Sequence, residues 1–158
     1  MDTGYVECAF GLKVRTPLLK QCVPESQLPY AAEAEGRTAG NALGQSWGLL
    51  NNRAFNAFMR RVWASPYRYD IKPVALIHDA IYLLIRNTPE VVKFVNDTLI
   101  EEMEWQDHPE IAHDTVKLGA ALDLFYPSWA DVLTLPNRAS QGEIEQLVDK
   151  YIKKINSI

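Results

Sequence analysis

His78 and Asp79 are the residues of this chain whose types and position most directly suggest chemistry. They separate two runs of β-branched and apolar residues, 73–77 and 80–85, that have almost no spacer between them. This pattern predicts a hairpin of buried strands with the polar pair at or beside its turn. A carboxylate close to an apolar core is costly unless a cation or several donors compensate it, so a bound metal ion is one interpretation. An ordinary hairpin with a polar turn is the other, because a dipeptide matches by chance.

The segment upstream of this hairpin has the pattern of a long helix. Residues 35–63 contain no proline, and their apolar residues recur at helical spacing, which predicts one helix that ends before Pro66. These apolar residues are Leu49, Leu50, Phe55, Phe58, Met59 and Val62. Glycine also recurs at every fourth position, as Gly36, Gly40, Gly44 and Gly48. Because residues four apart share a helix face, the glycines predict a bare strip that another backbone or a nucleic acid can approach closely.

A polar strip is predicted beside the glycines. Arg37, Asn41 and Gln45 are again four residues apart, and a rise of about 1.5 Å per residue places a hydrogen-bonding group every ~6 Å along the helix. The minor groove of DNA offers N3 and O2 acceptors that such donors bind without strong sequence preference. The alternative is a helix packed through its small residues, with the three polar side chains in solvent.

Several motifs of the chain, taken in order, resemble one protein family. The segment from Arg37 to Gly48, followed by Ile77-His78-Asp79, resembles the carboxyl-terminal palm region of family A DNA polymerases, which include bacterial DNA polymerase I and many bacteriophage replicative enzymes. The form Asn-x3-Gln-Ser-x-Gly is most similar to the bacteriophage branch. The resemblance extends over residues 4–132. Its other segments are a Gly-Tyr-Val-x3-Phe-Gly-x5-Pro hairpin from Gly4 to Pro17, Val116-Lys-Leu-Gly119 and Tyr126-Pro-Ser-Trp129.

The resemblance implies template-directed DNA synthesis, in which dNTPs are added to a primer–template DNA by two-metal nucleotidyl transfer. Asp79 matches a ligand of the Mg²⁺ pair, and His78 matches a residue that helps to position the primer terminus. Arg37, Asn41 and Gln45 match residues that contact the minor groove near the growing end. In this interpretation Asp79 and His78 are catalytic residues, and the three helix residues bind DNA.

The early hairpin supplies two further candidates. Lys13 and Arg15 are positioned as phosphate contacts, with a solvated basic turn as the equal alternative. Leu12 replaces a residue that is commonly basic in the family, so the sequence does not support a phosphate contact at that position.

Parts of the family's catalytic machinery have no counterpart in the sequence. The first-motif aspartate and the fingers helix are missing, and Ala80 stands where the family usually has Glu. One carboxylate cannot hold two metal ions, so we expect the chain to be the palm-completing subunit or fragment of a split polymerase. It would be a DNA-directed DNA polymerase only with an N-terminal polypeptide that carries the first two motifs. The alternative is an inactive remnant that acts as a DNA-binding or scaffolding protein.

Length and composition agree with a part of such an enzyme. The 158 residues suit a single domain, and the Met1 start and long carboxyl-terminal tail suggest a separately encoded subunit. The net charge of −4 lacks the basic excess of a free DNA binder and fits a subunit whose partner brings most of the basic surface. Two cysteines, no signal peptide and no apolar stretch of ~20 residues predict a cytoplasmic protein without a membrane segment, in a bacterial host if bacteriophage-encoded.

The remaining elements predict an α+β half-palm: an antiparallel sheet with helices on one side. Residues 1–136 form the palm portion and 137–158 a helical extension. Residues 20–34 are predicted as a loop, and residues 116–124 as a strand beside the 74–85 hairpin. Thr88-Pro89-Glu90 begins a helix whose apolar face comprises Val91, Val92, Val95, Leu99 and Met103. A last helix begins at Ser140, and its apolar stripe either packs on this domain or docks onto the partner.

Overall fold

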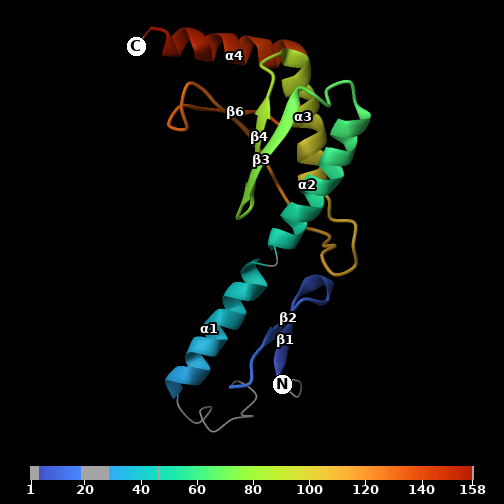
Figure 1. Ribbon diagram of the computed structural model, residues 1–158, viewed down its shortest axis with the longest axis vertical. Helices are drawn as coiled ribbons and strands as arrows, with labels where there is room; N and C mark the ends of the chain where they lie inside the picture. The colour runs from blue at the N-terminus through green and yellow to red at the C-terminus, as the bar shows by residue number, and fades with distance from the viewer. Residues whose placement is uncertain (1–3, 19–28, 46, 158) are drawn as a thin grey trace. The chain divides into compact units, whose positions relative to one another are not determined.

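The computed structural model describes residues 4–18, 29–45 and 47–157 (Figure 1). By contacts within the chain it divides into two compact units: residues 1–50 with 107–112, and residues 51–106 with 113–158. The described residues form a mixed α+β structure in which every strand belongs to a small antiparallel sheet. No helix among these residues has the length and apolar character that crossing a membrane requires.

The first unit contains a short hairpin and a helix. β1 (Tyr5–Glu7) pairs antiparallel with β2 (Lys13–Arg15), and the 3-10 turn η1 (Ala9–Gly11) connects them. α1 (Pro29–Gln45) contacts β2. The predicted loop over residues 20–34 is therefore wrong for 29–34, since these residues are helical and proline is tolerated in a first helical turn. Residues 20–28 of that prediction lie outside the described residues.

The helix predicted over residues 35–63 is present on both sides of residue 46, which lies outside the described part of the chain. α1 precedes this residue, and α2 (Trp47–Ala64) follows it. α2 ends before Pro66, as predicted, because proline disfavours helical geometry in the residue that precedes it.

The larger core of the second unit joins α2 to a hairpin and a third helix. β3 (Ile71–Ile77) pairs antiparallel with β4 (Ala80–Ile85), and α3 (Pro89–Met103) follows. Figure 1 shows the hairpin beside α2 and α3. The core residues are Phe58, Met59 and Val62 of α2, Ile71 of β3, and Val91, Val95 and Leu99 of α3, with Ile81, Leu83 and Ile85 of β4 packed against them. The predicted apolar face is thus confirmed as core for α3 and for Phe55, Phe58, Met59 and Val62 of α2, whereas the predicted Leu49 is exposed.

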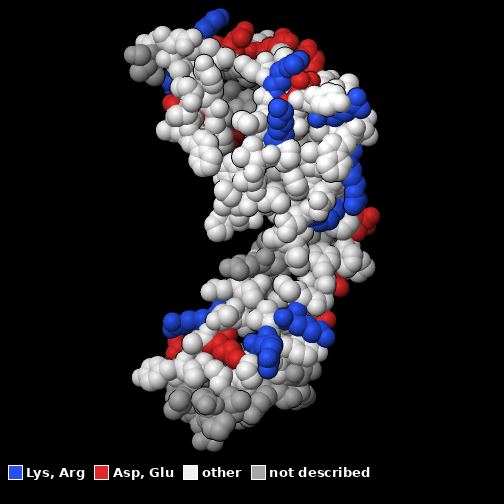
Figure 2. All heavy atoms as spheres, viewed as in Figure 1, with Lys and Arg blue, Asp and Glu red and all other residues white. Residues whose placement is uncertain are grey.

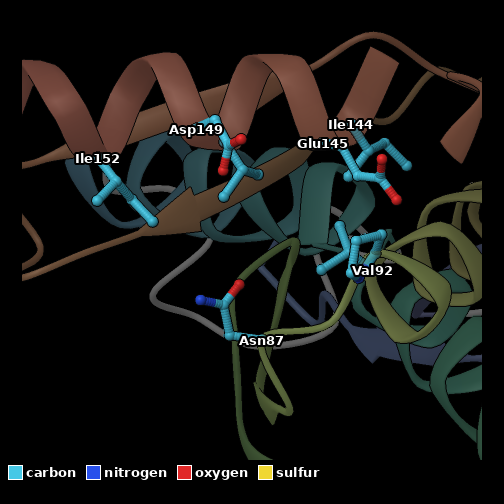
Figure 3. Close-up of a pocket in the computed structure, with 8 residues that line it drawn as sticks. Asn87, Val92, Ile144, Glu145, Asp149 and Ile152 are labelled. Atoms are coloured by element: carbon cyan, nitrogen blue, oxygen red, sulfur yellow. The ribbon is translucent and has the colours of Figure 1, made fainter. Parts of the chain in front are cut away.

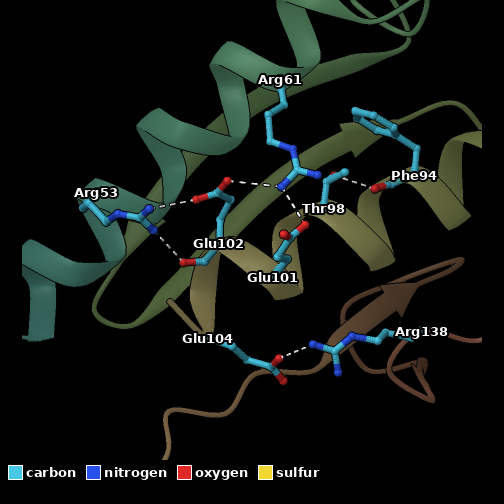
Figure 4. A network of polar contacts seen from close by, with 8 residues as sticks. All are labelled: Arg53, Arg61, Phe94, Thr98, Glu101, Glu102, Glu104 and Arg138. Atoms are coloured by element: carbon cyan, nitrogen blue, oxygen red, sulfur yellow. Dashed lines mark hydrogen bonds and ion pairs between the residues drawn. The ribbon is translucent and has the colours of Figure 1, made fainter. Parts of the chain in front are cut away.

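Two arginines of α2 and two glutamates of α3, Glu101 and Glu102, make polar contacts between these helices (Figure 4). Arg53 and Arg61 bind the Glu102 carboxylate from two sides, at 3.0 Å and 3.2 Å. Arg53 also donates to the Glu102 carbonyl at 3.0 Å, and its guanidinium lies over the Trp105 ring at 3.8 Å. Because Glu102 is largely buried, its two cations offset the desolvation of its charge.

A second, smaller core lies under the last helix. β5 (Leu122–Phe125) pairs with β6 (Val132–Leu135), and α4 (Gln141–Ile155) packs on them and on α3. Val92, Leu135, Ala139 and Ile144 form this core, and Leu147 and Val148 of α4 pack against it. The predicted start of α4 is confirmed by a capping box between Ser140 and Glu143. Of the two interpretations of its apolar stripe, packing on this chain describes the first half of α4.

Two expectations about the sheets are wrong. The predicted strand over residues 116–124 begins only at Leu122, and β5 pairs with β6 instead of lying in one sheet with β3 and β4. Within the described residues the strands form separate two-stranded sheets, so no continuous sheet is present there. The reason is that apolar alternation predicts a strand but not its partner, which depends on the hydrogen-bonding edge that the tertiary structure places beside it.

Candidate functional site

The turn of the β3–β4 hairpin consists of the two residues that the sequence singled out. The last strand pair is Ile77 with Ala80, so His78 and Asp79 alone connect the strands, as predicted. His78 has a φ of 55°, in the left-handed region that tight two-residue turns require. Histidine adopts this region more readily than most residues with a Cβ, but it still costs roughly 1–3 kcal/mol. The backbone of the turn is therefore held in a specific, mildly strained conformation.

Both turn side chains are exposed. Within the described residues the Asp79 carboxylate makes no ion pair or hydrogen bond, in contrast to Asp70 near the base of the hairpin, which binds Arg86 at 3.0 Å. Asp79 is thus available to a ligand or another chain. The prediction that the strands themselves are buried is wrong toward the turn, because Ile71 is 2% exposed at the base but Ile77 is 42% exposed at the tip.

One buried side chain of α2 reaches this turn. The Asn51 amide nitrogen donates to the carbonyl oxygens of His78 at 3.3 Å and of Ala80 at 3.4 Å. Asn51 is only 4% exposed, and its side-chain oxygen has no hydrogen-bond partner among the described residues. The two accepting carbonyls lie on either side of Asp79 in the chain.

Sequence reasoning missed Asn51, although a signal was present. The residue lies at helical spacing from Phe55, Phe58 and Val62, so it occupies the apolar stripe of α2. A buried polar residue on such a stripe lowers stability unless it finds a hydrogen-bond partner, so its presence indicates either such a partner or a functional role. That rule could have selected Asn51, but it could not have named the carbonyls that it binds.

The outer face of the hairpin carries an aromatic contact. The Trp129 ring stacks on the Tyr82 ring, with 5.3 Å between centroids and 10° between planes, and Phe125 packs against Trp129 at 6.3 Å. Tyr82 lies on β4 between Ile81 and Leu83, which face the core, so Trp129 covers the opposite face. The segment Tyr126–Trp129, singled out by the resemblance, therefore lies against the same hairpin as His78 and Asp79.

The candidate DNA-binding residues lie in the first unit. Arg37 and Asn41 are exposed on α1, one helical turn apart, and Arg37 is paired with Glu33. Gln45 ends α1, but its side chain lies outside the described residues. A Cβ added at Gly40, Gly44 or Gly48 would meet nothing within 4 Å, so no packing among the described residues requires glycine at these three positions.

Lys13 and Arg15 are exposed on β2 of the same unit. The Lys13 ammonium lies 4.6 Å from the centre of the Tyr5 ring, and a hydrogen bond with Tyr5 raises its pKa, with a further contribution from Glu7. Lys13 is therefore a full positive charge at neutral pH. Figure 2 shows basic and acidic side chains next to one another on the visible face of this unit, without a single basic patch.

The structure thus groups the predicted residues into two sets. His78 and Asp79 lie together in the second unit, and Asn51 joins them. Lys13, Arg15, Arg37 and Asn41 lie in the first unit, on the neighbouring elements β2 and α1.

A divalent cation would fit Asp79 as one ligand of an incomplete site. Carboxylate oxygens are the donors that Mg²⁺ prefers. Among the described residues no group of three or more histidine, cysteine, aspartate or glutamate side chains is arranged to hold a metal ion. The turn can therefore contribute one ligand, and the others would have to come from a partner, a nucleotide or water.

The second unit also has a groove of about 260 Å³ between α4 and the start of α3 (Figure 3). Val92, Ile144 and Ile152 give it an apolar lining, and Glu145 and Asp149 point into it from α4. Acidic side chains also gather over α4 in Figure 2. Among the described residues the lining contains carboxylates but no histidine, cysteine, serine or lysine, so no imidazole, thiol, aliphatic hydroxyl or amine side chain lines it.

Comparisons of the chain with protein-family models, with curated proteins and with solved structures give no match.

Proposed function

We propose that this chain is the palm-completing part of a split, bacteriophage-like family A DNA polymerase. The observation that carries the proposal is the two-residue turn His78-Asp79, which presents an exposed and unpaired carboxylate at the end of a hairpin. The order of the motifs along the chain supports it, since the turn follows a glycine-striped helix with Arg37 and Asn41 exposed on one face.

In this function the residues of the chain have separate roles. Asp79 would hold one side of a divalent metal pair, which when bound activates the primer 3′-hydroxyl and stabilises the leaving pyrophosphate. His78, next to it on the turn, would orient the primer terminus. Arg37, Asn41 and Gln45 would donate to the minor groove of the new duplex, and Lys13 and Arg15 would bind its phosphates. The partner polypeptide would supply the second aspartate and the residues that bind the incoming dNTP.

The test is primer extension by a reconstituted complex. The chain is mixed with a polypeptide that carries the first two motifs of the family, and extension of a primer–template is measured with Mg²⁺ and dNTPs. Asp79→Ala should lower the rate at least ~100-fold, because a metal ligand is lost, while complex formation persists, because the side chain is exposed. Asp149→Ala is the matched control, since it removes another exposed carboxylate of the same unit. Full extension by Asp79→Ala would reject the proposal.

A second candidate is an inactive polymerase remnant that binds DNA or acts as a scaffold. Ala80 favours it, because the family's glutamate after His-Asp is missing here. The two candidates predict the same binding of primer–template DNA to the complex but differ in catalysis. Mg²⁺-dependent extension by the wild-type complex supports the polymerase, and binding without extension supports the remnant.

A further inference from the structure

We infer that Asn51 is a positioning residue for the His78-Asp79 turn: its amide group holds the two carbonyls that flank Asp79 and thereby aims the Asp79 carboxylate. The inference rests on the proposed function for its catalytic consequence but not for its structural one. It concerns a residue outside the motifs that carry the resemblance, and it follows from contacts between α2 and the hairpin.

The Asn51 amide contacts the backbone on both sides of Asp79. The carbonyls of His78 and Ala80 belong to the peptides that follow these two residues, so they set the backbone orientation on both sides of Asp79. The last strand pair is Ile77 with Ala80, and the His78 carbonyl therefore lies beyond the regular ladder. Asn51 supplies a donor to it from α2. Both distances, 3.3 Å and 3.4 Å, are long for such bonds, and the two hydrogens of the amide nitrogen allow it to donate to both carbonyls.

The backbone that Asn51 contacts has an unusual conformation at His78. His78 adopts a φ of 55°, which the two-residue turn requires and which a residue with a Cβ otherwise avoids, so the turn gains from a contact that holds it in place. The side chains at the tip cannot hold it by packing, because Leu76, Ile77 and His78 are exposed. Among the described residues, the contact that reaches the turn from the buried part of the unit is the Asn51 amide.

Burial of the Asn51 side chain lowers the stability of the fold. The Asn51 side-chain oxygen is buried without a partner, which is unfavourable, whereas an apolar side chain of similar size would suit the stripe that Asn51 occupies on α2. The two carbonyls lie at an exposed turn, where water could replace the amide. Asn51 is therefore a poor choice for stability and a suitable one for fixing the turn, and the two roles predict different outcomes on substitution.

Asn96 offers a matched control. It is also a buried asparagine with an unpartnered side-chain oxygen, and its amide donates to the Pro136 carbonyl at 2.9 Å. It lies in α3 of the same unit but binds the end of β6 rather than the hairpin turn. Asn96→Leu thus repeats the chemical change of Asn51→Leu at a site that does not hold Asp79.

The experiment measures the turn in the chain itself and catalysis in the complex. With Asn51→Leu we expect backbone amide exchange at Ile77 and Ala80, the last pair of the ladder, to become at least about tenfold faster by NMR, with the thermal midpoint of unfolding unchanged or higher. In the complex, kcat should fall about 10- to 100-fold while KM for dNTP stays the same, because a reacting group is misplaced and not lost. Asn51→Gln keeps the amide group, so it should partly restore both slow amide exchange at the turn and kcat. Asn96→Leu should leave the turn and kcat unchanged.

The outcomes separate this inference from the proposed function. Unchanged exchange at the turn in Asn51→Leu overturns the inference, and so does a loss of stability without a local change at residues 77–80. If Asn51→Leu does not fold, Asn51→Ala, which cannot overpack the site, is judged by the same criteria. A faster-exchanging turn in a chain whose complex never extends a primer supports the positioning role and rejects the polymerase.

Discussion

The two ends of the β3–β4 hairpin are built from similar residues but are held in different ways. At the base, Ile71 and Ile85 pack against α2 and α3 and share the main core of the second unit. At the tip, Ile77 is 42% exposed, and His78 and Asp79 are exposed as well. Apolar packing therefore fixes the base, whereas a buried amide from α2 fixes the tip.

Residues at the base of the hairpin therefore contribute to stability, whereas residues at the tip are available for binding. Residues at the base contribute to the free energy of unfolding through the surface that they bury. Residues at the tip contribute little to it, so they can be exposed, strained or unpaired without unfolding the unit. A site that must meet another molecule is best placed at the end of a hairpin whose other end is anchored in a core.

The largest expected change in the free energy of unfolding comes from a substitution in the core under the base of the hairpin. Phe58 is fully buried in the core under the hairpin, and Phe58→Ala should lower the free energy of unfolding by about 3–5 kcal/mol through lost burial and a cavity. Ile77→Thr, at the tip, should change it by no more than about 0.5 kcal/mol. Chemical denaturation of both variants provides the measurement. Equal losses would mean that the tip is part of the core after all.

A smaller change, an increase in stability, is expected from a substitution in α1 of the first unit. Gly40 is exposed within α1, and a Cβ there would meet nothing within 4 Å, so Gly40→Ala should stabilise the helix by about 1 kcal/mol. Amide exchange along α1 measures the gain. If the glycine strip faces DNA, fluorescence anisotropy should also show weaker binding of a primer–template duplex by the complex. A stabilised variant with unchanged affinity would remove the strip from the DNA-binding surface.

The smallest effect concerns the polar contacts that begin α4. Hydrogen bonds from the Ser140 backbone and hydroxyl lower the pKa of Glu143. A carboxyl with a lowered folded-state pKa adds stability above its ordinary pKa and loses it as the pH falls through the lowered value. Glu143→Gln should therefore flatten the acid side of the stability curve slightly, since glutamine can still complete the capping box. Thermal unfolding between neutral and acid pH checks this, and identical curves would contradict it.

Local sequence signals predicted the elements well where the relevant physics is local. The two-residue connection at His78-Asp79, the start of α3 after Thr88 and the capping box at Ser140 all agree with the structure. Each depends on the conformational preferences of a few neighbouring residues, such as a proline in the first turn or a hydroxyl at the helix cap.

Signals that depend on distant parts of the chain failed or were missing. Apolar residues in β3 predicted burial, but the hairpin packs on the core of α2 and α3 through Ile71 of β3 and through Ile81, Leu83 and Ile85 of β4, and most of β3 is exposed. The strand expected over 116–124 has β6 as its neighbour instead of the hairpin. Asn51 stood out on the apolar stripe of α2, but its acceptors lie 27 and 29 residues away in the chain.

The sequence by itself determined that a histidine and an aspartate form the turn of a hairpin, because strand-forming residues on both sides leave only these two for the connection. The tertiary structure alone decided that this turn is exposed and that an asparagine of α2 holds it. Exposure and hydrogen bonding between distant segments depend on which surfaces pack together, and no property of the residues next to Asp79 specifies that packing.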